Sequence, residues 1–345
     1  MSKQILFFIK SIYDAYHNEY GIRKIDVKFN KYAHHTVLTE DGKFISPKLK
    51  DLINTIQYEH SEHVINIKGV PVSVSIYKPL PYDANNDKIN KIIQTIQFIA
   101  YLCKSINRNF HDEITIKIVL SPFKKMMSSI GEHLTAYNIN SGFTMRDYHR
   151  GLSEIVIFRE EEVNKVLIHE LLHSFDIDSK LLNESYDMKF MKLFKKETRI
   201  SLNECFTESF ACLINVCLAS IHYAVKRKIS LNDAFVRLLD YERDYIVSVG
   251  ERVGKHNFTN KREQTNITSY YVLKAITWMD IDSFARYIIA NKYTIGRYRD
   301  YAQYLGKILD DNKNRIINMK LSDKRDVRTV NNMSIRMSSI DIFNI

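Results

Sequence analysis

Hydrophobic and polar residues recur with two different periods along the chain, and these periods divide it into two halves. In the first half, alternation with a period of two predicts strands at 24–30, 63–79, 113–121 and 153–159. The second of these is broken at Gly-Val-Pro, as expected for a hairpin. Apolar positions with helical spacing predict helices at 3–18, 46–60 and 84–107.

From residue 180 onward, the periodic segments all have helical spacing. They predict helices at 180–197, 202–226, 231–251, 265–279, 282–291 and 298–311, whereas the last twenty residues show no period. Ten Gly and five Pro leave little room for linkers. We therefore expect an α+β fold, with a mixed sheet and helices in residues 1–178 and an all-helical part in residues 179–345.

The strand at 153–159 leads directly into a helical segment, KVLIHELLHSF, at 165–175. His169 and His173 lie four residues apart, so both imidazoles project from one face and can reach one zinc ion. Glu170 lies about 100° further round the helix, where it can act as a general base on a water beside the metal. The alternative is an ordinary buried helix with hydrogen-bonded histidines, because so short a pattern also occurs by chance.

A catalytic zinc needs a third protein ligand, and the segment SLNECFTESFACL at 201–213 offers two carboxylates. Glu204 and Glu208 are four residues apart on one helix face, so one can bind zinc while the other supports a ligand histidine. Glu204 also fits a capping box with Ser201, and Glu208 fits an exposed helix carboxylate. We favour Glu204 as the ligand of one Zn²⁺ per chain. The opposite assignment, with Glu208 as the ligand and Glu204 as the supporting carboxylate, stays open.

These motifs resemble the gluzincin branch of zinc metallopeptidases. The second gluzincin motif is matched here by Asn203, Glu204, Phe206 and Thr207, with Glu208 in the place of the supporting acid. TESFA at 207–211 equally resembles the Glu-x-Phe-Ala of other families, and the thirty residues between His173 and Glu204 exceed the thermolysin spacing. Residues 138–216 resemble predicted metallopeptidases of large DNA viruses.

The resemblance implies a zincin-like fold in which the HELLH helix lies between the two parts of the chain. The strand at 153–159 would be an edge strand that binds an extended peptide, with the loop at 138–144 on the rim of the site. Asp176 and Asp178 fit either a hydrogen bond to a ligand histidine or the cap of the next helix, and we favour the cap.

A peptidase of this kind also needs a hydrogen-bond donor for the developing oxyanion, usually a Tyr or a His. The helical half offers Tyr270, Tyr271, His222 and His256, of which we choose Tyr271. With 21 Tyr in the chain, packing is the competing explanation for each of the tyrosines.

The net charge of +10 lies mainly in residues 221–345, which hold 22 basic and 14 acidic side chains. This bias, with interleaved tyrosines, raises the alternative of a nucleic-acid-binding protein. We do not favour it, because Tyr298, Tyr301 and Tyr304 have the spacing of a packed helix face. A third alternative is a metal-binding structural or virion-associated protein without activity, against which the presence of Glu170 argues.

The four cysteines and the N-terminal segment indicate in which cellular compartment the protein is expected. Cys103, Cys205, Cys212 and Cys217 fit no zinc knuckle, so we expect buried, reduced thiols. The apolar run near the N-terminus is too short for a signal peptide, and we expect no later segment to approach a membrane-spanning length. The chain is therefore expected in the cytoplasm, or in the virion if it is viral, with a peptide or protein as substrate and no membrane partner. The sequence indicates no oligomeric state.

Overall fold

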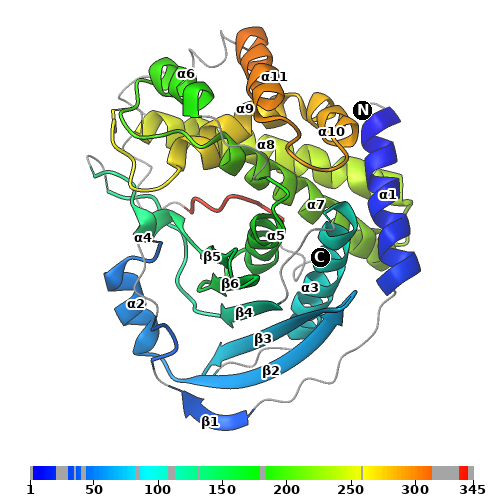
Figure 1. Ribbon diagram of the computed structural model, residues 1–345, viewed down its shortest axis with the longest axis vertical. Coiled ribbons are helices and arrows are strands. Elements are labelled where there is room, and N and C mark those ends of the chain that lie inside the picture. The colour runs from blue at the N-terminus through cyan, green and yellow to red at the C-terminus, as the bar shows by residue number, and fades with distance from the viewer. Residues whose placement is uncertain are drawn as a thin grey trace.

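A computed structural model of the chain describes residues 3–20, 30–34, 36–39, 44–81, 86–107, 113–129, 132–178, 184–257, 259–312 and 334–340. Within these ranges, a six-stranded sheet has the order β1-β2-β3-β4-β6-β5 and lies below a thick layer of helices (Figure 1). The predicted α+β class is confirmed. The predicted strand at 24–30 lies, except for its last residue, outside the described residues.

The sheet is mixed, as predicted. Its strands are β1 Asn30–His34, β2 Tyr58–Ile67, β3 Val70–Pro79, β4 Glu113–Val119, β5 Gly142–Asp147 and β6 Leu152–Ile157. β3, β4 and β6 run parallel to one another, and the remaining pairs are antiparallel. β2 and β3 form the predicted hairpin, with Gly69 at φ 86° in its turn.

Two sequence-based expectations for the sheet are wrong. β6 pairs with β4 on one side and β5 on the other, so β6 is an interior strand and β5 is the edge. β5 also replaces the last three residues of the loop expected at 138–144, and α4 (Ala136–Ile139) takes its first two. The alternation of β5 is weak, since Phe143 is its one buried apolar side chain.

The helix expected at 46–60 is shorter than predicted. α2 spans Pro47–Asn54, and Tyr58 already begins β2. Asn54 uses its side-chain amide to bind both backbone groups of Leu38, at 2.9 and 2.8 Å. Tyr58 is fully buried in a cluster on the outer face of the sheet. This tertiary burial outweighs the helical spacing of the segment.

The remaining helices form the layer above the sheet. They are α1 Lys3–Tyr20, α3 Asn86–Ile106, α4 Ala136–Ile139, α5 Val163–Ser174, α6 Glu184–Phe194, α7 Leu202–Arg227, α8 Leu231–Asn257, η1 Thr268–Leu273, α9 Lys274–Met279, α10 Ile281–Ala290 and α11 Tyr298–Asp311. The N-terminal α1 packs beside α7, with the Phe8 and Phe210 rings 6.2 Å apart (Figure 1). The predicted helical second half is confirmed, whereas a boundary between residues 178 and 179 stays a prediction.

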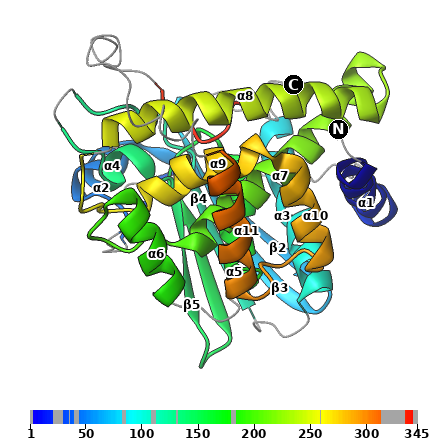
Figure 2. The ribbon, with the colours of Figure 1, turned by 90° about the horizontal axis from the view of Figure 1, so that it is seen from above.

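α7 contacts α1, α5, α8, η1 and α9, and Figure 2 shows the long α8 running along one side of the helical layer. The expectation that no segment approaches membrane-spanning length is wrong, because α7 has 26 residues and an apolar window long enough to cross a bilayer. That window is 78% buried inside the protein. The four cysteines are free and buried, as predicted, and three of them lie on α7.

Residues 334–340 return to the core in an irregular conformation. Ser334 forms a β-bridge with Met126, and the backbone N–H of Ile335 donates to the carbonyl of Lys125. Ile335, Met337, Ser338 and Ile340 are buried. The segment, red in Figure 1, lies beside α5 and therefore near the HELLH motif.

Candidate metal centre

α5 carries the HELLH motif between the sheet and α7. Eleven of its twelve residues are buried. Leu167, Ile168, Leu171 and Leu172 belong to the main hydrophobic core, which fixes the orientation of the helix. His169, Glu170 and His173 line the cleft beside it. The helix is therefore a rigid, buried support for polar side chains on one face.

Three ligand atoms converge at the cleft. Nε2 of His169 and Nε2 of His173 lie 3.0 Å apart, and Oε2 of Glu204 lies 3.4 and 3.2 Å from them. Ligands of a tetrahedral zinc at 2.0–2.1 Å are separated from one another by about 3.3 Å. The spacing of these atoms therefore matches that of three ligands around one zinc ion.

Glu208 lies behind His169 instead of beside Glu204. Its Oε2 is 2.9 Å from Nδ1 of His169, within hydrogen-bonding distance although the N–H direction is less well aligned than at His173. Nδ1 of His173 faces Oδ2 of Asp178 at 2.7 Å. Asp178 also accepts a hydrogen bond from Asn203, at 3.2 Å. Of the two interpretations of Asp178, the contact with a histidine is the one that the geometry realises.

This arrangement tests whether the residues fit a metal. In the neutral form that binds a metal, each ring would carry its proton on Nδ1, because carboxylates only accept hydrogen bonds, and would turn the Nε2 lone pair toward the other histidine and Glu204. Three acceptors then face one another at 3.0–3.4 Å. A cation at their centre resolves that conflict, and a borderline-soft ion such as zinc suits two nitrogens and one oxygen.

The charges around the histidines are closely coupled. Burial opposes the charged form of His173, but the carboxylates of Asp178 and Glu204 outweigh it and hold the His173 pKa well above its ordinary value. Burial likewise opposes ionisation of Glu208, yet the ammonium groups of Lys165 and Lys274 keep the Glu208 pKa well below its ordinary range. The centre therefore strongly attracts positive charge.

Glu170 is held from the edge strand. Oγ1 of Thr144, on β5, donates to Oε2 of Glu170 at 2.7 Å. Arg146, two residues further along β5, donates to the backbone carbonyl of His173 at 2.7 Å and pairs with Asp176. Sequence reasoning missed both residues, because it assigned part of β5 to a loop. The alternation of Thr144 and Arg146 on one strand face is the signal that would have found them.

A cleft of about 480 Å³ opens in front of His169, His173 and Glu204. Its walls come from β5, α5, the start of α7 and the segment that leads into η1. Tyr270 lines this cleft, with its ring centroid 6.0 Å from that of His169. η1 is a π-helix, a conformation that is frequent at functional sites.

Tyr271, our sequence-based choice, does not line the cleft. It is buried, and its hydroxyl donates to the backbone carbonyl of Ile335 at 2.8 Å. His222 packs against Tyr16 of α1, and His256 contacts Ser128 Oγ at 2.9 Å. The structure thus brings neither histidine to the centre, and it corrects the choice of Tyr271.

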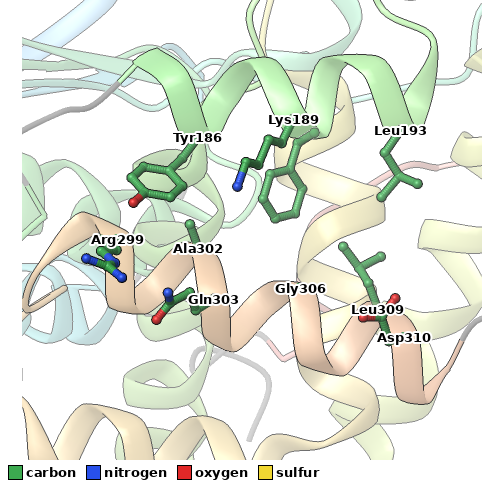
Figure 3. Close-up of a pocket in the computed structure, with 10 residues that line it drawn as sticks. Tyr186, Lys189, Leu193, Arg299, Ala302, Gln303, Gly306, Leu309 and Asp310 are labelled. Atoms are coloured by element: carbon green, nitrogen blue, oxygen red, sulfur yellow. The ribbon is translucent and has the colours of Figure 1, made fainter.

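A second cavity, of about 400 Å³, lies between α6 and α11 (Figure 3). Ala302 and Gly306 form its floor on α11, facing Tyr186, Lys189 and other side chains of α6. None of the predicted site residues lines it. The cavity arises because two small residues lie four apart on α11.

No protein-family model matches the chain. The chain is 26% identical, over 176 aligned residues, to an uncharacterized protein of Acanthamoeba polyphaga mimivirus; the match covers 47% of this chain and 43% of that protein. Among solved structures, it is similar to an aminopeptidase N family protein from Idiomarina loihiensis, at 14% identity and a TM-score of 0.37, covering 74% of this chain and 42% of that one. The chain thus spans less than half the length of either protein.

Proposed function

We propose that the protein is a zinc-dependent metallopeptidase. The observation that carries the proposal is the convergence of His169, His173 and Glu204 at one point of an open cleft. Glu170 lines the same cleft, and we assign it the role of general base. Glu208 and Asp178 contact the distal nitrogens of the two histidines, as partners of metal-ligating histidines usually do.

A zinc ion at this point would act as a Lewis acid that acidifies water and polarises a substrate carbonyl. Glu170 takes one proton from the attacking water as the new C–O bond forms, and then delivers it to the departing amine nitrogen as the C–N bond breaks. Thr144 keeps one carboxylate oxygen of Glu170 fixed during both transfers. Tyr270 replaces Tyr271 as the proposed donor to the developing oxyanion.

The edge strand supports a peptide as the substrate. β5 pairs with β6 on one side, and the order of the described sheet ends at β5. An extended peptide can therefore add to β5 as a further strand, beside Gly142 and Thr144, which line the cleft. This role passes from β6, which the sequence had suggested, to β5.

Two alternatives are less well supported. A nucleic-acid-binding face built on the α11 tyrosines conflicts with the burial of Tyr298 and Tyr301, which pack in the core. A metal-binding structural protein would have no need for Glu170 in the cleft. The similarity to a mimivirus protein supports a viral origin, and we place the protein in the host cytoplasm or the virion.

Metal analysis combined with a peptide library tests the proposal. We expect near-stoichiometric zinc in the wild type and in Glu170→Gln, with turnover only in the wild type. His169→Ala and Glu204→Gln should lose zinc, whereas Glu208→Gln should retain it with reduced affinity. Zinc without turnover in the wild type would favour the structural protein. Absence of zinc, after loading conditions that suffice for a control zinc enzyme, would overturn the proposal.

A further inference from the structure

Glu208, which contacts His169, is itself held by two buried lysines. Nζ of Lys165 lies 2.8 and 3.0 Å from the two carboxylate oxygens, and Nζ of Lys274 lies 3.1 Å from Oε1. The side chains of all three are almost fully buried. Oε2, which receives only the longer Lys165 contact, is the oxygen that faces His169.

Residues 334–340 hold the second of these lysines in place. Lys274 donates to the backbone carbonyl of Met337 at 2.6 Å, so its ammonium group bridges that carbonyl and Glu208. The segment is fastened on either side of this contact. Tyr271 donates to the carbonyl of Ile335, and the N–H of Ser338 donates to Glu162 at 2.6 Å.

A buried carboxylate is stable in its ionised form only when cations and donors surround it. If Lys274 loses its charge, Glu208 keeps one ammonium partner, Lys165, which is then free to pull the carboxylate away from His169. Zinc affinity depends strongly on such partners of ligand histidines. They fix the orientation of the ring and determine which ring nitrogen is unprotonated and can bind the metal. The effect therefore passes from Met337 through Lys274 and Glu208 to His169.

We infer that Lys274 is a positioning residue for the metal centre, and that residues 334–340 are an integral part of that centre. The inference rests on the proposed zinc site but assigns it a component far away in the sequence. Lys274 touches no zinc ligand in the described structure. It acts only through Glu208.

Zinc dissociation constants, measured by competition with a chelating dye, test this inference. Lys274→Met should bind zinc about 10- to 100-fold more weakly than the wild type. Lys196→Met is the matched control, since Lys196 is a buried lysine that likewise bridges a carboxylate and backbone carbonyls: it pairs with Glu263 at 3.0 Å and donates to the carbonyls of Asn257 and Asn260, instead of contacting Glu208 or residues 334–340. Equal zinc affinity in the two variants would overturn the inference. If Lys274→Met does not fold, Lys274→Gln replaces it, because its amide can still donate a hydrogen bond.

A double-mutant cycle separates positioning from general destabilisation. In the Glu208→Gln background, Lys274→Met should change zinc affinity little, because the carboxylate through which it acts is gone. Additive losses would contradict the inference. Unfolding curves of the metal-free variants establish that each one is folded.

A second readout needs no metal. In protein labelled with ¹⁵N-histidine, Lys274→Met should shift the signals of the His169 ring nitrogens, while Lys196→Met should leave them unchanged. The His169 signals are identified by their loss in His169→Gln. If the wild type binds no zinc, the proposed function fails and this measurement still decides the inference. Identical His169 signals in both lysine variants would refute it.

Discussion

At the scale of single residues, the roles in the centre depend on fine placement that spacing does not reveal. Glu204 and Glu208 are equivalent by helical periodicity, and only the depth of α7 relative to α5 lets Glu204 reach both Nε2 atoms while Glu208 reaches one Nδ1. Tyr270 and Tyr271 are adjacent, and the π-helix turns one to the cleft and the other to Ile335. Sequence reasoning could therefore predict the two histidines and Glu170 and could favour Glu204 over Glu208 while leaving the exchanged roles open, but it chose Tyr271 instead of Tyr270.

Thr144→Val tests the support of Glu170. The substitution keeps the shape of the side chain but removes the hydroxyl that donates to Glu170 Oε2. We expect kcat/KM to fall by roughly 10-fold, which corresponds to the loss of about 1.4 kcal/mol of transition-state stabilisation from a hydrogen bond to a charged group. Zinc content should not change. Thr144→Ser, which retains the hydroxyl, should recover most of the activity; an equal loss in both variants would contradict the role.

At the scale of elements, the sequence predicted those with strong periodicity, including the HELLH helix, and missed the strand β5 that lines the cleft beside it. α3, α7 and α8 have long apolar faces, and β3 and β4 alternate regularly. β5 carries Gly142, Thr144 and Arg146, which line the cleft instead of filling a core. A strand whose residues serve a site lacks the pattern by which strands are recognised.

Gly142 determines how closely β5 approaches α5. A Cβ atom there would lie 3.0 Å from the carbonyl of Val156 and 3.0 Å from a methyl of Val166. Because a backbone atom cannot easily yield, Gly142→Ala should destabilise the fold by about 1–3 kcal/mol and shift Thr144 away from Glu170. Gly306→Ala, in α11 with open space around it, should instead stabilise by up to about 1 kcal/mol. Denaturant unfolding measures both, and equal effects would contradict the close approach.

We expect the contact between α1 and α7 to make the stability of the fold depend on pH. His222 of α7 packs near Tyr16, and burial, with the charge of Lys91, lowers the His222 pKa to about 4. The folded state therefore disfavours the protonated ring. The stability that the buried neutral ring contributes is present above the ordinary pKa of 6.5 and is lost as the pH falls toward 4. Between pH 7 and pH 4.5, the free energy of unfolding should fall by roughly 2 kcal/mol less in His222→Phe than in the wild type. His149→Gln, at an exposed site, is the control; a pH dependence unchanged by His222→Phe would refute this assignment.

At the scale of the whole molecule, the centre lies where the sheet half meets the helical half. His169 and His173 come from α5, and Glu204 comes from α7 on the other side of the predicted boundary between residues 178 and 179. One hydrophobic core runs from α1 through α5 and α7 to Ile340. Because the halves share one core and both contribute to the proposed metal site, we expect them to unfold together.

Calorimetry with and without zinc measures this coupling. We expect a single transition, shifted upward by zinc because the ion binds only when α5 and α7 are docked; at 100 times the dissociation constant the gain is about 2.7 kcal/mol. Glu170→Gln should show the same shift, since Glu170 is not a ligand, and Glu204→Gln should show little of it. Two transitions, with zinc moving only one, would mean that the halves fold separately and that one half alone holds the ion. A single transition that zinc shifts equally in wild type and Glu204→Gln would exclude Glu204 from the ligand set and return Glu208 to that role.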